Sequence, residues 1–192
     1  MIYWIVRFLL AVAARIVFRM KISGTDNIPE EGPFILCSNH IHSYDPAMLA
    51  ISMKRQLRFM AKKELFEKKM SGGFFRALGA FPVDREAADL SSYRNAMKAL
   101  KSGMGLLVFS QGTRMQKLNI KGAKGGVALF GVKSKAPIIP AGISGSYRLF
   151  SPLTIRFGPA IILDDVYDNR LKSEQIESIM SEIMSKVEEL VD

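Results

Sequence analysis

The stretch from Ser38 to Pro46, Ser-Asn-His-Ile-His-Ser-Tyr-Asp-Pro, constrains this chain more than any other, because it holds both of its histidines. The four residues before it, Phe-Ile-Leu-Cys, are continuously apolar, as in a strand that is covered on both faces of a parallel sheet. Asp45 followed by Pro46 is typical of a helix start, with an N-cap and a first-turn proline. His40 is therefore expected where a strand gives way to a helix, the edge at which open α/β sheets bind ligands.

Strand-like and helix-like segments alternate along the 192 residues, which predicts a single α/β domain with a mostly parallel central sheet flanked by helices. Beyond the first strand, we expect strands at residues 57–61, 79–85 (entering a loop), 106–109, 137–141, 153–157 and 160–163. We expect helices at residues 46–53, 66–76, 90–102 and 122–132, and a final helix that begins at Ser173.

The first 21 residues contain no acid and are mostly large and apolar. As a helix they place four cations within one arc: Arg7, Arg15, Arg19 and Lys21. This pattern predicts a membrane-interface helix over residues 1–21, followed by the main domain over residues 22–192. The alternative is a helix that docks on the core of a soluble protein. The uncharged run at residues 8–14 is far shorter than the roughly 18 apolar residues that a membrane span needs.

The net charge of +9 is unevenly distributed, because residues 90–163 contain no aspartate or glutamate. That interval carries eleven bases: Arg94, Lys98, Lys101, Arg114, Lys117, Lys121, Lys124, Lys133, Lys135, Arg148 and Arg156. Such a segment is expected to meet an anionic partner, either a nucleic acid, phospholipid head groups or a phosphorylated small molecule. The chain has no nucleic-acid recognition motif and no interleaved aromatic stacking platform, so we expect no nucleic-acid partner.

The single cysteine, Cys37, lies within the first apolar strand and is interpreted as a small buried hydrophobe. No disulfide can form within the chain, which fits a reducing compartment.

The residues of the central stretch could in principle form a metal site, a nucleophilic serine site or a general-base site. His40, His42 and Asp45 are acceptable metal ligands, but zinc sites use three or four protein ligands and the chain offers no other histidine, so no metal is predicted. A nucleophilic serine is disfavoured because the chain lacks a Gly-x-Ser-x-Gly elbow. The remaining interpretation makes His40 a general base that Asp45 orients. The structural alternatives are a helix N-cap for Asp45 and a satisfied strand-end histidine for His40.

Four motifs in order resemble those of the glycerolipid acyltransferases, specifically the lysophosphatidic acid (1-acylglycerol-3-phosphate) acyltransferase family. The first is Asn39-His40 with Asp45 five residues after the histidine, and the second is Gly-Ala-Phe-Pro-Val-Asp-Arg at residues 79–85. The third is Phe-Ser-Gln-Gly-Thr-Arg at residues 109–114, and the fourth is Pro-Ile-Ile-Pro at residues 137–140.

The resemblance implies a glycerol-3-phosphate acyltransferase-like fold. It also implies that His40 deprotonates the free hydroxyl of a lysophospholipid, which attacks an acyl thioester directly, while Asp45 orients the base. The acceptor would be 1-acylglycerol-3-phosphate and the product phosphatidic acid. Its phosphate would be held by Arg85, Gly112, Thr113 and Arg114, which match the family's motifs, and by Lys62, which resembles another position linked to acceptor binding. Acyl-CoA or acyl carrier protein would be the co-substrate, and no cofactor would take part. The enzyme would be a peripheral or monotopic protein at the cytoplasmic face of a membrane.

The third motif departs from the family pattern Phe-Pro-Glu-Gly-Thr-Arg, because Ser110 replaces the proline and Gln111 replaces the glutamate. Glutamine keeps the shape of glutamate but loses its charge, which makes Gln111 a candidate determinant of acceptor specificity. The same chemistry on a different lyso-lipid acceptor is therefore one alternative. A non-catalytic lipid-surface protein of the same fold is another, and the intact His40 and Asp45 argue against it.

Overall fold

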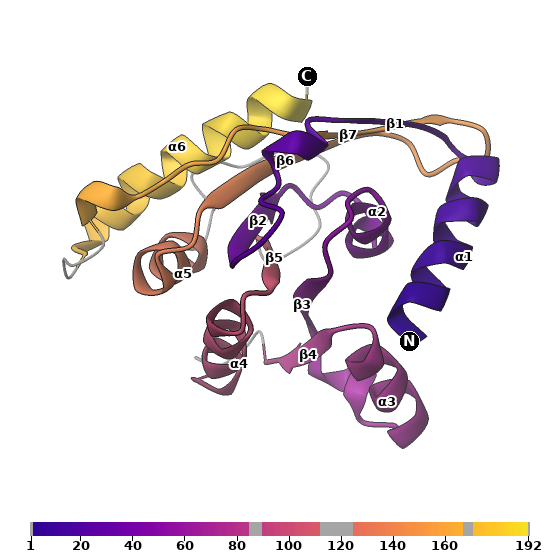
Figure 1. The fold of residues 1–192 in the computed structure, drawn as a ribbon, viewed down its shortest axis with the longest axis horizontal. Helices are drawn as coiled ribbons and strands as arrows, with labels where there is room; N and C mark the ends of the chain where they lie inside the picture. Colours follow the sequence, from indigo (N-terminus) through magenta and orange to yellow (C-terminus); the bar gives the residue numbers. More distant parts are fainter. Residues whose placement is uncertain (1, 85–89, 112–124, 167–170, 192) are drawn as a thin grey trace.

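A seven-stranded sheet runs through the centre of the computed structural model, which describes residues 2–84, 90–111, 125–166 and 171–191 (Figure 1). The strand order is β1-β7-β6-β2-β5-β3-β4, and every neighbouring pair is parallel except β6 with β7. This confirms the predicted mostly parallel α/β sheet. The strands are β1 (Arg19–Ser23), β2 (Phe34–Ser38), β3 (Leu57–Lys62), β4 (Ala80–Val83), β5 (Gly105–Phe109), β6 (Ile138–Gly145) and β7 (Pro152–Phe157).

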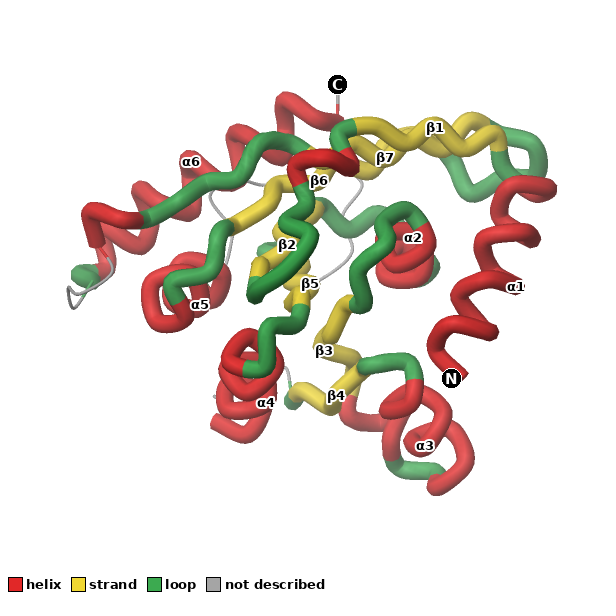
Figure 2. The backbone as a smooth tube through the Cα atoms, viewed as in Figure 1, coloured by secondary structure: helices red, strands yellow, loops and turns green. Residues whose placement is uncertain are grey.

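Helices cover both faces of the sheet (Figure 2). The described α-helices are α1 (Ile2–Val17), α2 (Asp45–Ile51), α3 (Lys69–Ala77), α4 (Leu90–Lys101), α5 (Gly126–Ser134) and α6 (Ser173–Val191). Short 3-10 turns occupy Thr25–Asn27, Lys63–Phe66 and Asp164–Val166. Helices α4, α5 and α6 pack on one face, and α1 and α2 pack on the other (Figure 1).

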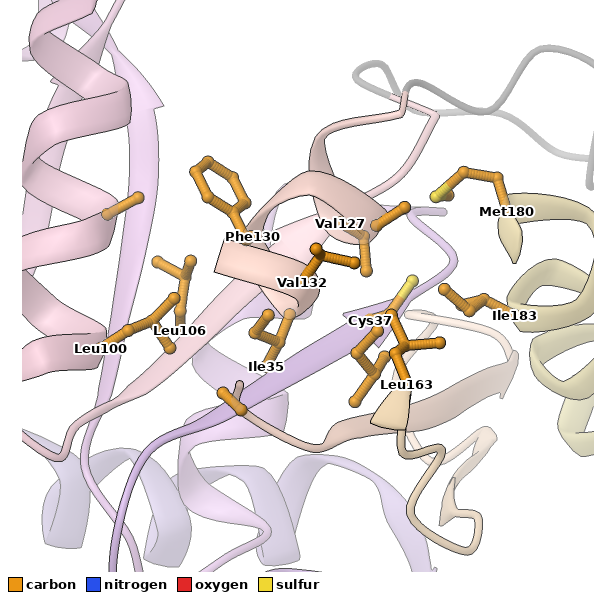
Figure 3. Packing of buried hydrophobic residues seen from close by; sticks show 14 of the residues in the cluster. Ile35, Cys37, Leu100, Leu106, Val127, Phe130, Val132, Leu163, Met180 and Ile183 are labelled. Carbon is orange, nitrogen blue, oxygen red and sulfur yellow. The ribbon is translucent and has the colours of Figure 1, made fainter. Parts of the chain in front are cut away.

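The central strand β2 divides the core, because its side chains alternate between the two faces. Ile35 and Cys37 join the apolar cluster under α4, α5 and α6 (Figure 3). Phe34 and Leu36 join the cluster under α1 and α2. All four are fully buried, which confirms the prediction from the apolar run. Burial raises the pKa of the Cys37 thiol to about 12, so this cysteine is the buried hydrophobe that was expected.

Helix α1 ends at Val17, four residues earlier than expected, and residues 19–23 form strand β1 at the edge of the sheet. The prediction that Arg19 and Lys21 belong to a helical cationic arc was therefore wrong. The backbone N–H of Arg19 donates to Ser151 O, and β1 then pairs along β7. This strand depends on a partner more than a hundred residues away, which helical periodicity alone could not indicate.

Arg7 also departs from the expected cationic arc, because it points toward the protein. Its guanidinium donates to the carbonyl oxygens of Ala50, at 2.9 Å, and Met53, at the end of α2. Tyr3 and Ala14 are buried on the same side of α1. The opposite side is apolar and exposed, with Phe8 67%, Leu9 60% and Ile16 67% accessible. The helix thus docks on the core and also presents an apolar face outward.

No helix among the described residues combines the length and the apolar character needed to cross a bilayer.

Two of the predicted strands also differ from the observed sheet. Residues 160–163 form no named strand and contribute a single bridge, between Ile138 and Ile161. Strand β6 continues to Gly145, four residues beyond the predicted end, because it pairs with β7 over its second half.

Candidate active site

His40 lies two residues beyond the carboxyl end of β2, and α2 begins five residues later at Asp45. Strand β2 is flanked by β5 and β6, so this end of the strand lies in the middle of the sheet edge. The predicted position of His40 is confirmed. A parallel sheet gathers the residues that follow its strands at this edge, which explains why polar side chains from distant segments meet there.

The carboxylate of Asp45 is fully buried and has four hydrogen-bond donors. One oxygen, Oδ2, lies 2.7 Å from His40 Nδ1 and accepts the backbone N–H groups of Ile41 and His42, each at 2.7 Å. The other, Oδ1, accepts the hydroxyl of Tyr147 at 2.5 Å. Such a set of donors compensates the cost of burying a charged carboxylate. The structure therefore brings together the predicted pair, His40 and Asp45.

Asp45 is not the N-cap of α2, so the structural alternative for this residue was wrong. Tyr44 occupies the cap position and makes no side-chain capping bond, while Asp45 and Pro46 are the first helical residues. The Asp45 oxygens are instead occupied by the preceding loop and by Tyr147, which leaves none for the helix N–H groups.

Two further contacts fix the position of His40. Its ring stacks on Phe109 of β5, with centroids 4.0 Å apart and planes 16° apart. The side chain of Asn39 donates to Ile143 O and accepts from Ile143 N, both at 2.8 Å, and so ties the end of β2 to β6. The histidine is thus supported from β5, from β6 and from Asp45.

Tyr147 is a site residue that the sequence analysis missed. It follows β6 after Gly145, whose φ of +107° is a conformation that favours glycine and turns the chain out of the strand. Burial, followed by the hydrogen bond to Asp45, raises the pKa of the Tyr147 hydroxyl, so it stays a donor. The signal was the carboxyl end of β6, but the sequence prediction ended that strand at residue 141 and so placed the edge four residues too early.

The hydrogen-bond pattern also indicates which tautomer His40 adopts. Because the Asp45 carboxylate can only accept, the Nδ1 atom that faces it carries the hydrogen. Nε2 is then left with a lone pair, as a general base requires. A buried carboxylate at Nδ1 also stabilises the imidazolium that forms when Nε2 takes a proton.

His42 does not join this pair. Its Nδ1 accepts the backbone N–H of Tyr44 at 3.3 Å, and its ring stacks on Tyr147 with centroids 4.4 Å apart.

Within the described residues, no three His, Cys, Asp or Glu side chains are grouped so that they could hold a metal ion.

The remaining predicted site residues divide into two groups. Lys62 is the last residue of β3, is exposed, and pairs with Glu64 at 3.0 Å. Gln111 follows β5 after Ser110 and is only 7% exposed, and neither polar atom of its side chain has a hydrogen-bond partner among the described residues. The other residues fall outside the described part of the chain: Arg85, Gly112, Thr113 and Arg114. The last described residues before them, Asp84 and Gln111, follow β4 and β5 at the same sheet edge.

The fold and the site together describe an α/β protein that holds a histidine against a buried carboxylate at the carboxyl end of its central strand. A family model described as Acyltransferase matches residues 19–144, which is more than half of the chain. The chain therefore belongs to the acyltransferase family, and the recognition made from its four motifs is confirmed.

Two curated relatives are similar over much of the chain. The 1-acyl-sn-glycerol-3-phosphate acyltransferase of Streptococcus pneumoniae is 32% identical over 175 residues, which cover 87% of this chain and 64% of that protein. The Bacillus subtilis protein of the same name is 34% identical over 127 residues, which cover 66% of this chain and 63% of the relative. In both comparisons the matched part is less than two thirds of the relative's length.

A solved structure shares the fold. It is the 1-acyl-sn-glycerophosphate (LPA) acyltransferase PlsC from Thermotoga maritima, with a TM-score of 0.72 at 23% identity over 96% of this chain and 79% of that chain.

Proposed function

We propose that this protein transfers an acyl chain from an acyl thioester to the free hydroxyl of 1-acylglycerol-3-phosphate, giving phosphatidic acid. The observation that carries the proposal is the 2.7 Å contact of His40 Nδ1 with the buried Asp45 carboxylate, which prepares Nε2 to accept a proton. The names of the two bacterial relatives supply the acceptor.

In the proposed reaction, Nε2 of His40 removes the proton of the acceptor hydroxyl as its oxygen attacks the thioester carbonyl carbon. The tetrahedral intermediate then collapses, the carbon–sulfur bond breaks, and the leaving thiolate takes the proton back from the His40 imidazolium. Asp45 stabilises that cation throughout. Acyl-CoA or acyl carrier protein is the co-substrate, and no cofactor enters the cycle.

The acceptor phosphate is assigned to Lys62, Arg85, Gly112, Thr113 and Arg114. Lysine and arginine suit phosphate oxygens because both carry fixed positive charge, and arginine can donate two parallel hydrogen bonds. Lys62 supports this assignment by its place at the end of β3, on the same sheet edge as His40.

A cavity of about 130 Å³ between α1, α2, α3 and β3 is proposed to receive part of an acyl chain. Its walls are almost entirely apolar and include Val6, Leu10, Ala47, Ile51, Phe59 and Phe75. Pro46 and Ala47 also line it, directly after Asp45 in the chain, so the cavity adjoins the helix turn that carries the catalytic carboxylate.

The reaction is proposed to take place at the cytoplasmic face of a membrane, with the protein attached peripherally. The exposed apolar side of α1 supports this, because an amphipathic helix binds a bilayer by burying such a face among the lipid chains.

An acyl-transfer assay with a panel of lysophospholipids tests the proposal. Purified protein and an acyl thioester should acylate 1-acylglycerol-3-phosphate with a higher kcat/KM than uncharged or zwitterionic lyso-lipids. A higher kcat/KM on another lyso-lipid would overturn the assigned acceptor, and turnover of none of them would overturn the enzymatic proposal.

Replacing Tyr147 with phenylalanine should lower kcat roughly tenfold and leave the KM of both substrates unchanged. A hydrogen bond to a charged group contributes about 1.5–3 kcal/mol, and the three other donors to Asp45 would retain part of that energy. KM should not change because the proposed reaction assigns Tyr147 no contact with a substrate, only the hydrogen bond to Asp45.

Steady-state kinetics of Tyr147→Phe and Tyr44→Phe check this prediction. Tyr44 is 57% exposed, and its ring lies against the rings of His42 and Tyr147. Its variant is therefore a matched control that should keep full activity. Equal kcat values for wild type and Tyr147→Phe would show that Tyr147 does not position the pair.

Gln111 is the residue through which acceptor choice is proposed to act, because its buried amide has no hydrogen-bond partner in the described part of the chain, which is unusual unless a ligand supplies one. Gln111→Met removes both unpaired atoms at similar volume, so thermal stability should be equal or higher while kcat/KM for the acceptor falls several-fold. Gln111→Glu restores the family residue and should shift relative kcat/KM across the lysophospholipid panel by several-fold. The KM of the acyl donor should change in neither variant. Superimposable acceptor profiles for all three proteins would remove Gln111 from acceptor recognition.

A further inference from the structure

A groove at the end of α1 is used by no step of the proposed reaction. It has a volume of about 500 Å³ and combines two arginines with apolar side chains. Its lining residues are Arg15, Ile16, Phe18, Arg19, Met20, Ile22 and Phe150.

Both arginines of the groove are exposed, and no acidic side chain in the described part of the chain pairs with them. Neither the Arg15 nor the Arg19 guanidinium makes an ion pair or hydrogen bond with any residue in the described part of the chain. Arg15, in the last turn of α1, also complements the negative end of that helix, but Arg19 lies in β1 and has no such role. Two guanidinium groups at one groove suit the oxygens of a phosphate.

The turn at residues 148–151 adds an apolar rim with an unusual backbone. Leu149 is 65% exposed and Phe150 is 59% exposed, and Phe150 has a φ of +57°, which is rare for a bulky side chain. The turn is fastened to the end of α1, because Phe150 N donates to Val17 O at 2.7 Å and Arg19 N donates to Ser151 O. Such strained residues persist where the surrounding structure enforces them, and they concentrate at binding sites.

We propose that this groove binds the phosphate of an anionic phospholipid in the membrane on which the enzyme works. Arg15 and Arg19 would contact the phosphate, while Leu149, Phe150 and the outward face of α1 enter the acyl layer. Two observations assign the ligand to a lipid. The apolar rim flanks the arginines, and Ile16, which lines the groove, belongs to the exposed apolar face of α1. The inference rests on the proposed membrane location, but its test measures binding without catalysis.

Sedimentation with lipid vesicles tests the proposal. The double variant Arg15→Gln/Arg19→Gln should bind vesicles of phosphatidylcholine with phosphatidylglycerol roughly ten- to thirtyfold more weakly than wild type, and bind pure phosphatidylcholine equally well. Arg94→Gln/Lys98→Gln is the matched control. Arg94 and Lys98 belong to the acid-free basic segment, but they are exposed on α4, which packs on the face of the sheet opposite to α1. The control therefore removes the same charge away from the groove and should keep wild-type affinity.

Phe150→Gly gives an independent readout. Glycine relieves the positive φ, so the thermal midpoint should be equal or higher while affinity for both kinds of vesicle falls.

Equal binding by wild type and Arg15→Gln/Arg19→Gln would overturn the proposal, as would equal weakening in the α4 control. Unchanged vesicle binding with a raised KM for acyl-CoA would assign the groove to the donor instead. Absence of acyl transfer in wild type with the expected vesicle results would overturn the proposed function and leave this site standing.

Discussion

Purified His40→Ala should lose acyl transfer by a factor of about 10²–10⁴ in kcat, the usual cost of removing a general base. The fold should survive. The ring of His40 supplies one of four donors to Asp45, so the buried carboxylate keeps the N–H groups of Ile41 and His42 and the hydroxyl of Tyr147. The loss should therefore appear in turnover while the circular dichroism spectrum stays native.

His42→Ala is the matched control, since it removes the other histidine of the same loop. His42 stacks on Tyr147 and does not contact Asp45 through its side chain, so its variant should lose only a few-fold in kcat. Near-normal turnover by His40→Ala, or an equal loss in both variants, would contradict the assignment of His40 as the base.

Replacing two outward residues of α1, Phe8 and Leu9, with glutamine should release the protein from vesicles, with affinity falling by more than about a hundredfold. Both side chains are more than half exposed, and inserting a large apolar side chain into lipid contributes about 1.5–3 kcal/mol. Since every 1.4 kcal/mol is tenfold in affinity, the two side chains together account for that loss. Glutamine preserves the helix, and the buried contacts of Tyr3, Arg7 and Ala14 are untouched.

Leu90→Gln/Ile162→Gln is the control for this experiment. These residues are 70% and 57% exposed, close to the values for Phe8 and Leu9. Leu90 is the first residue of α4, and Ile162 lies between Ile161 and Leu163, which belong to the apolar cluster on the opposite face of the sheet. Vesicle sedimentation should show the control bound like wild type. If Phe8→Gln/Leu9→Gln stayed bound, α1 would not be the membrane contact, and the exposed Met70 and Phe74 of α3 would mark the next surface to vary.

The features predicted correctly are those that neighbouring residues determine. The apolar run at residues 34–37 sufficed to predict that β2 is covered on both faces. The short spacing from His40 to Asp45 sufficed to predict that the histidine and the carboxylate meet. Even the wrong detail there, the N-cap interpretation of Asp45, arose because local sequence cannot say which of several donors a carboxylate will accept.

The features that the sequence analysis missed depend on contacts between distant segments. Strand β1 pairs along β7, more than a hundred residues away. Its basic and apolar residues alternate as in a strand, but the segment is only five residues long and follows α1 almost directly, so the sequence analysis extended the helical pattern over it. Tyr147 meets Asp45 across 102 positions of the chain, and the sequence ended β6 too early to reveal that meeting. Arg7 likewise looked like a lipid-facing cation, yet the carbonyl groups at the end of α2 draw it inward.

Thiol release from an acyl thioester, measured with and without 1-acylglycerol-3-phosphate, tests direct acyl transfer by the His40–Asp45 pair most directly. Wild type should release thiol only when the acceptor is present, in amounts equal to the phosphatidic acid formed, and His40→Ala should release almost none. A burst of thiol equal to the enzyme concentration without acceptor, with the acyl group retained on the protein, would contradict the direct mechanism. No thiol release with the acceptor present would contradict the proposed activity itself.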